Sequence, residues 1–125
     1  MVDALRRASR WVRRDGCVID IHPTAQVPTI EAGGRVVGRV EVPDGPARHG
    51  AADRALRQVV DEGRLVETVS HAFDFYTWGD SFEELREHIE ENWRDARIAV
   101  DGAAPAGRCR AVERVRIAKL VVAGG

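Results

Sequence analysis

The segment from Arg10 to Pro23 limits what this chain can fold into more than any other part of the sequence. It contains Gly16 at a point where a helix usually ends in a residue of left-handed conformation. The five residues that follow, Cys17–Ile21, are apolar and rich in β-branched side chains, which predicts a buried, interior strand. His22 and Pro23 end this strand, because proline cannot donate to a central ladder. The rest of the chain is therefore expected to cover a buried strand near the N-terminus.

Asp20 and His22 are the candidate catalytic residues. They lie near the carboxyl end of the predicted strand, where open α/β sheets place their ligands. Because residues two apart on a strand share a face, the pair could act as a base and its orienting partner. A structural alternative is favoured over this one, with Asp20 as the hydrogen-bond partner of a surface loop and His22 as a strand cap.

Composition argues against two classes of partner. The chain has 19 Lys and Arg residues against 20 Asp and Glu, a net charge of −1, so no overall field favours nucleic acid or an anionic membrane. No apolar run approaches the roughly 20 residues of a membrane span, and no apolar signal segment follows the N-terminal charges. We therefore expect one cytoplasmic domain over residues 1–125 that binds neither nucleic acid nor membrane.

The cysteine pattern is not that of a disulfide scaffold. Cys17 and Cys109 are far apart in sequence and belong to no Cys-x-x-Cys pair, so both are expected as reduced thiols, with Cys17 buried. A zinc site would need ligands from five separate elements, and no metal is predicted. The residues available for such a site are His22, His49, His71, His88, Cys17 and Cys109.

Apolar residues at helical spacing predict three helices. The first covers Val2–Arg14, and the second runs from Ala51 to a stop at Gly63. The third begins at Ser81, whose hydroxyl can accept from the amide of Glu84 in a capping box.

A hairpin is predicted around Gly33-Gly34, because a primed turn needs positive φ at its central positions. Its strands are Val27–Ala32 and Arg35–Val42. The other segments predicted from the sequence are long strands over Arg64–Trp78 and Cys109–Val122 and a loop over Ile98–Arg108.

Tyr76 and Trp78 are the candidate substrate-binding residues, since aromatic side chains of this number could line a pocket. Their spacing, together with that of Phe82 and Trp93, is typical of core residues, and this core interpretation is favoured. No serine lies in a Gly-x-Ser-x-Gly context, so the sequence gives no support to nucleophilic catalysis.

The order of these elements resembles the C-terminal half of a bacterial class I S-adenosylmethionine-dependent methyltransferase. In that family a helix ends in a Leu-x-Pro-Gly-Gly turn and leads into the fifth strand; here Val12–Gly16 and Cys17–Pro23 stand at those places. Three other segments are also similar to such methyltransferases: Ala52–Leu56, Phe73–Tyr76 and Asn92-Trp93. The resemblance covers nearly the whole chain. It implies an α/β or α+β fold, with a partial mixed sheet of about four to five strands, an inserted hairpin and about three helices.

One departure from the family bears on activity. Class I methyltransferases hold the cofactor with a Gly-rich turn after the first strand and an acidic residue at the end of the second, and this chain has neither. The chain alone is therefore expected to have no cofactor-binding residues and to bind S-adenosylmethionine weakly or not at all. The cofactor would be bound only if a partner supplied the missing half. Whether the chain is an enzyme is left open.

The resemblance also implies an unpaired edge, because Cys17–Ile21 would lack the neighbour that the full fold places beside it. Exposed strand edges pair. We therefore expect a homodimer, or a complex with a separate cofactor-binding polypeptide, formed through this edge or through the N-terminal helix. On another interpretation, the chain works only as half of a split enzyme.

A function of a different class is kept as the alternative: a free-standing α+β domain that binds a small ligand, of the cone-shaped type similar to the nuclear-transport-factor fold. A parallel neighbour for Cys17–Ile21 would favour the methyltransferase order, whereas purely antiparallel pairing would favour this alternative.

Overall fold

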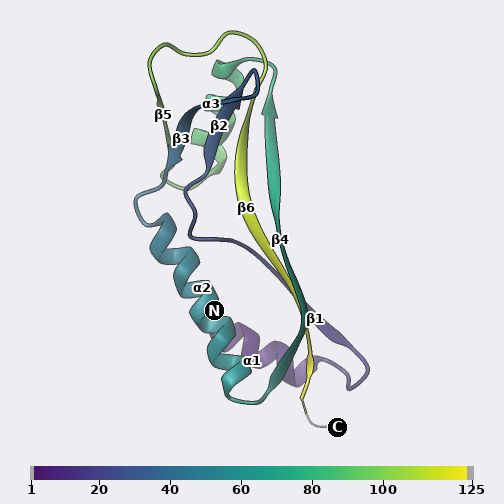
Figure 1. Cartoon of the computed structure of the whole chain (residues 1–125). Coiled ribbons are helices and arrows are strands. Elements are labelled where there is room, and N and C mark those ends of the chain that lie inside the picture. Colours follow the sequence, from purple (N-terminus) through teal and green to yellow (C-terminus); the bar gives the residue numbers. More distant parts are fainter. Residues whose placement is uncertain (1, 124–125) are drawn as a thin grey trace.

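The computed structural model describes residues 2–123, and in these residues three helices pack on one six-stranded sheet (Figure 1). The expectation of an α/β or α+β fold is thus confirmed in its α+β form, but the expected mixed sheet is wrong, because the strands described in residues 2–123 pair only antiparallel. In chain order the elements are α1 (Val2–Trp11), β1 (Cys17–Pro23), β2 (Thr29–Ala32), β3 (Arg35–Glu41), α2 (Gly45–Asp61), β4 (Leu65–Gly79), α3 (Phe82–Asn92), β5 (Arg97–Val100) and β6 (Cys109–Val122).

Strand β6 is the centre of the sheet. Along one side it pairs with β4 from end to end, and its other side is shared by β1 and β2 (Figure 1). Strand β1 lies opposite Val115–Val121 and β2 lies opposite Cys109–Val112. Beyond β2 the sheet continues through β3 to β5. Every pairing is antiparallel, so β1 has no parallel neighbour within residues 2–123.

The two ends of the sheet are covered on opposite faces. Side chains alternate along β6, so Cys109 and Ala111 point to one face and Ala118 and Leu120 to the other. The first pair belongs to a buried cluster under α3, with Phe82, Leu85 and Ile89. The second pair belongs to a buried cluster under α1 and α2, with Leu5, Ala55, Leu56 and Val59. Each half of the sheet is therefore left with one face that no helix of the described chain covers.

The predicted turns and caps are present. Gly33 and Gly34 have φ of 58° and 77°, which joins β2 to β3 by the expected primed turn. The Ser81 hydroxyl accepts a 3.1 Å hydrogen bond from the Glu84 amide at the start of α3. Gly63, with φ of 75°, follows α2 as predicted.

Helix α2 begins at Gly45, six residues before the predicted start at Ala51. Pro46 is the reason for the difference, because a proline usually indicates a break in a helix. The proline occupies the first turn of the helix, where a missing amide hydrogen costs nothing and the fixed φ is already helical.

Strand β5 was not predicted, because three of its four residues, Ile98–Val100, were assigned to the loop over Ile98–Arg108. It pairs with β3, and this pairing raises the strand count above the expected four to five. Ile98 and Val100 pack against the cluster under α3, so burial stabilises a segment whose own strand signal is short.

The prediction of a buried interior strand for Cys17–Ile21 is wrong. Strand β1 is an edge strand, hydrogen-bonded on one side to β6. Its Asp20 and His22 side chains are the buried ones, while Ile19 is 51% and Ile21 60% exposed. Cys17, expected to be buried, is also exposed. It shares a face of β1 with Ile19 and Ile21, and no described helix covers that face in this half of the sheet.

None of the helices described between residues 2 and 123 has both the length and the apolar character that crossing a bilayer demands.

Candidate functional site

Asp20 and His22 lie side by side on the covered face of β1. His22 Nδ1 is 2.6 Å from Asp20 Oδ2, and the side chains of both residues are 7% exposed. The other ring nitrogen, Nε2, is 3.1 Å from Asp53 Oδ1 on α2. Alternation on β1 brings the first two residues together as predicted, whereas Asp53 comes from a helix 31 residues further along the chain.

The cluster continues to Arg116 on β6, which lies 3.4 Å from Asp53 Oδ1 and forms an ion pair with Glu67 on β4. Both nitrogens of His22 face carboxylate oxygens, which only accept hydrogen bonds. The arrangement cross-links β1 to α2. The base-and-partner hypothesis stays a prediction, whereas the surface-loop role favoured for Asp20 is wrong, because Asp20 is buried.

Tyr76 and Trp78 are exposed, so the core interpretation favoured from their spacing is wrong. They lie on the face of β4 opposite α3, where the guanidinium of Arg110 is 4.1 Å from the Tyr76 ring centre and that of Arg108 is 4.2 Å from the Trp78 ring centre. Arg110 is also held by Glu31 on β2 at 2.8 and 2.9 Å. The stacked arginines already cover one face of each ring.

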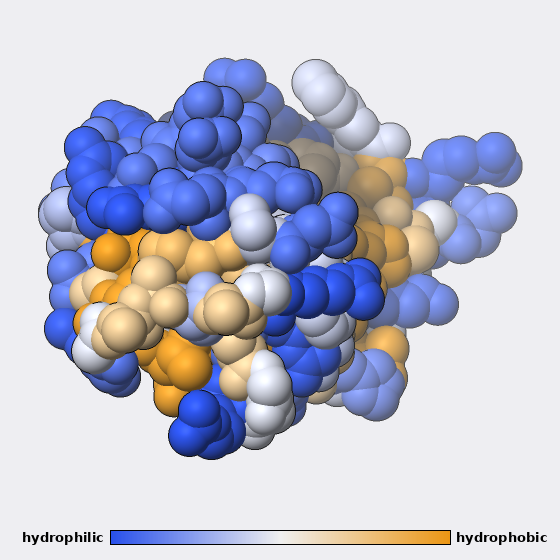
Figure 2. Space-filling model, turned by 90° about the horizontal axis from the view of Figure 1, so that it is seen from above, coloured by the Kyte–Doolittle hydropathy of each residue, from blue (hydrophilic) through white to orange (hydrophobic). Residues whose placement is uncertain are grey.

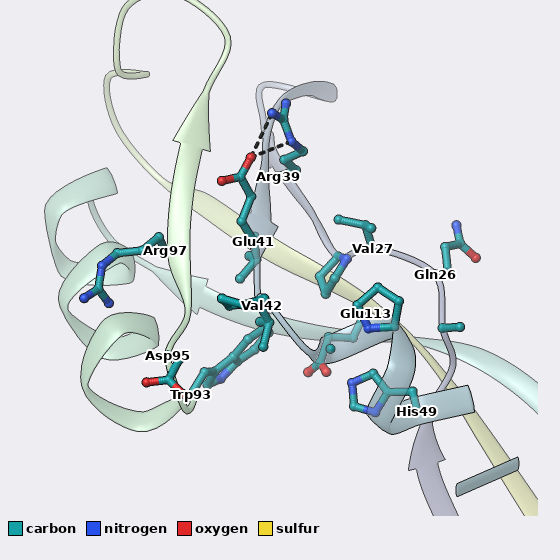
Figure 3. A pocket seen from close by; sticks show the side chains of 16 residues that line it. Gln26, Val27, Arg39, Glu41, Val42, His49, Trp93, Asp95, Arg97 and Glu113 are labelled. Carbon is teal, nitrogen blue, oxygen red and sulfur yellow. Dashed lines mark hydrogen bonds and ion pairs between the residues drawn. The ribbon is translucent and has the colours of Figure 1, made fainter. Parts of the chain in front are cut away.

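The candidate functional site is a cavity of about 380 Å³ that the sequence did not reveal. It lies between the segment that joins β1 to β2, the end of β3, the first turns of α2 and the turn after α3 (Figure 3). Much of its wall is apolar, formed by Val27, Pro28, Val42, Pro43, Pro46 and Trp93. A volume of this order is typical of small-molecule sites.

Two titratable groups reach this cavity. Figure 3 shows the Glu113 carboxylate and the His49 imidazole directed into the same region, with the Trp93 indole across from them. Burial raises the pKa of the Glu113 carboxyl above its ordinary value. Burial, and to a lesser extent the neighbouring Arg48 and His22, lowers the pKa of His49, so its imidazole is neutral at pH 7.

The other charged groups around the cavity already have partners. Arg39 pairs with Glu41 at 2.8 Å, and Asp95 lies 3.8 Å from Arg94. Arg97 donates to the Ala96 carbonyl at 2.8 Å. Within residues 2–123, Glu113 makes neither a hydrogen bond nor an ion pair.

One signal in the sequence could have revealed Glu113. Residues 109, 111, 113 and 115 share one face of β6, and Cys109, Ala111 and Val115 are buried there. A single glutamate in such a row predicts a carboxyl facing the interior. His49 gave no comparable signal, because its position depends on where α2 begins.

No group of three or more histidine, cysteine or acidic side chains in the described part of the chain is arranged to hold a metal ion. Comparison of the chain with protein-family models, with curated proteins and with solved structures finds no match. The interpretation of the cavity therefore depends on its own residues.

Replacing Glu113 with glutamine is expected to stabilise the protein at pH 7.5, raising the melting temperature by about 2 °C. Because burial raises the pKa of Glu113, ionising this carboxyl costs more in the folded state than in the unfolded chain. The free energy of unfolding therefore falls as pH rises from 4.5, the pKa in the unfolded chain, through the higher pKa of the folded state. The gain should therefore shrink towards pH 4. Melting curves at both pH values check this, with Glu87→Gln on the exposed side of α3 as the control. Equal melting temperatures for the wild-type chain and Glu113→Gln at pH 7.5 would contradict it.

Proposed function

We propose that the chain is a methyltransferase-like C-terminal subdomain that does not transfer methyl groups by itself and acts by association, pairing the free edge of β1 with that of a second copy. The single observation that carries this proposal is the open edge of β1. Among the described residues β1 is hydrogen-bonded to β6 alone. The antiparallel pairing of β1 within residues 2–123 favours the alternative function over the methyltransferase order, but the parallel neighbour that the resemblance implies would occupy this same open edge.

Among residues 2–123, three strands of the sheet have a free edge, and β1 is the least protected of them. Natural sheets blunt their edges with short strands, bulges and outward charges. Strand β5 has four residues, and β4 has a bulge between Glu67 and Val69 and bears Asp74. On β1 the outward residues Cys17, Ile19 and Ile21 carry no charge, because its polar residues point to the covered face.

A second copy suits this edge. Two β1 strands can pair antiparallel about a twofold axis, which makes the contact self-complementary and closed. The apolar side chains of β1 would then adjoin those of the second copy, on a face that continues over β6 to the exposed Val66, Val69 and Phe73 of β4. Lys119 is the charged residue in the middle of this face, so two copies bring together little like charge.

We expect the wild-type chain to be a dimer by size-exclusion chromatography with light scattering, and its mass to be unaffected by S-adenosylmethionine. Ile21→Lys should be a monomer, because a lysine at the edge of β1 opposes pairing. The matched control, Val69→Lys, puts the same charge on the same open face but on the far strand β4, and should remain a dimer.

A wild-type chain that is monomeric at millimolar concentration would contradict the proposal. If both lysine variants weaken the dimer equally, the two copies contact each other through the open face and not through the edge of β1. If the chain forms a complex only with a separate cofactor-binding polypeptide, the partner of the β1 edge is that polypeptide and not a second copy.

The cavity beside Glu113 favours a second candidate function, the binding of a small ligand. Its volume, its apolar wall and its few polar groups are those of a ligand site. This function agrees with the purely antiparallel pairing of β1 and is compatible with association, since no residue of β1 lines the cavity.

A further inference from the structure

The cavity beside Glu113 points to a ligand class: we propose that it takes a small organic ammonium ion, with the cationic nitrogen at Glu113 and an apolar body against Trp93. This inference rests on the second candidate function above and names its ligand. It follows from three properties of the cavity: an unpaired acid, a neutral acceptor beside it and an aromatic wall.

The first property is the unpaired carboxylate. Removing a charged group from water is costly unless an opposite charge or hydrogen-bond donors compensate it. Glu113 is half-buried, and within residues 2–123 nothing donates to it. Figure 3 shows the guanidinium groups of Arg39 and Arg97 directed away from it. An ammonium ion in the cavity would provide both the charge and the donors.

The second property is the neutral imidazole. His49 points into the same region as Glu113, and in its neutral form one of its ring nitrogens accepts a hydrogen bond (Figure 3). An ammonium group has several N–H donors and can contact both residues. An anionic ligand would meet the negative charge of Glu113, while the guanidinium groups of Arg39 and Arg97 are directed away from it (Figure 3), which argues against carboxylates and phosphates as the ligand class.

The third property is the wall. Trp93, which follows α3, lines the cavity on one side, and Val27 lies on the other side (Figure 3). An indole attracts a nearby cation through its ring and packs well against an apolar body. A volume of about 380 Å³ suits an alkyl- or arylammonium ion of roughly ten non-hydrogen atoms.

The test is a calorimetric titration with 2-phenylethylammonium and with its uncharged counterpart 2-phenylethanol. The wild-type chain should bind the ammonium ion at least tenfold more tightly than the alcohol. Glu113→Gln should lose this preference, and Glu87→Gln, which changes an exposed glutamate of α3, should keep it. The Trp93 indole N–H resonance should shift on binding, while those of Trp11 and Trp78 should not.

Each other outcome is decisive. Equal binding of the two probes by the wild-type chain overturns the ligand class and leaves small-ligand binding in place. Binding of neither probe overturns both. If the wild-type chain and Glu113→Gln bind the ammonium ion with equal affinity, the cation is attracted by the protein surface in general. This result overturns the role of Glu113.

Discussion

Replacing His22 with alanine is expected to reduce the free energy of unfolding by about 3 kcal/mol. The His22 residue is 6% exposed, and its removal leaves the carboxylate of Asp20, 8% exposed, without its 2.6 Å partner. It also removes the contact to Asp53, which joins β1 to α2. A buried charge that has lost its partner costs more than the contact itself contributes.

Urea unfolding followed by circular dichroism measures this loss. His71→Ala is the matched control, because His71 lies exposed on β4 and should tolerate the change to within about 0.5 kcal/mol. Asp20→Asn combined with His22→Ala should cost less than the sum of the two single changes, since the pair acts as a unit. A loss below 0.5 kcal/mol for His22→Ala would show that the cluster does not stabilise the fold.

Replacing Gly38 with alanine is expected to cost about 3 kcal/mol or to release β5 from the sheet. A Cβ atom on Gly38 would lie 2.3 Å from the carbonyl oxygen of Ala99 and 3.1 Å from the Cα of Val100, both backbone atoms of β5. Backbone cannot move aside as a side-chain tip can, so β5 itself must shift. Hydrogen exchange should show early loss of the bond from the Asp101 amide to the Val37 carbonyl.

Gly50→Ala is the control for this change. Gly50 lies inside α2, where a new Cβ would meet only the tip of the Arg54 side chain. Alanine is the better helix former, so this variant should gain about 0.5 to 1 kcal/mol. If the free energies of unfolding of Gly38→Ala and the wild-type chain are equal, β3 and β5 are not as close as described.

Features that depend on local chemistry could be predicted from the sequence. Three features depend on residues that are close together in the sequence: the turn at Gly33-Gly34, the Ser81 cap and the closing strand Cys109–Val122. The contact of Asp20 with His22 was predictable in the same way, because alternation alone puts them on one face.

Features that depend on distant neighbours could not be predicted. An apolar strand such as β1 is compatible with an interior or an edge position, and the difference lies in whether a second strand pairs with it. Tyr76 and Trp78 have core spacing on β4, yet no described helix covers their face in this half of the sheet. Likewise, Asp53 reaches His22 only through the packing of α2, and Arg116 of β6 reaches Asp53 in turn.

Hydrogen exchange of the β1 amides at several protein concentrations tests the central claim, association through the free edge of β1, most directly. We predict that the amides of Cys17–Ile21 that point away from β6 exchange more slowly as concentration rises, while those of the exposed edge of β4 do not change. Fast exchange of these β1 amides at every concentration, together with a dimeric mass, would place the contact elsewhere. The same fast exchange with a monomeric mass would contradict association altogether.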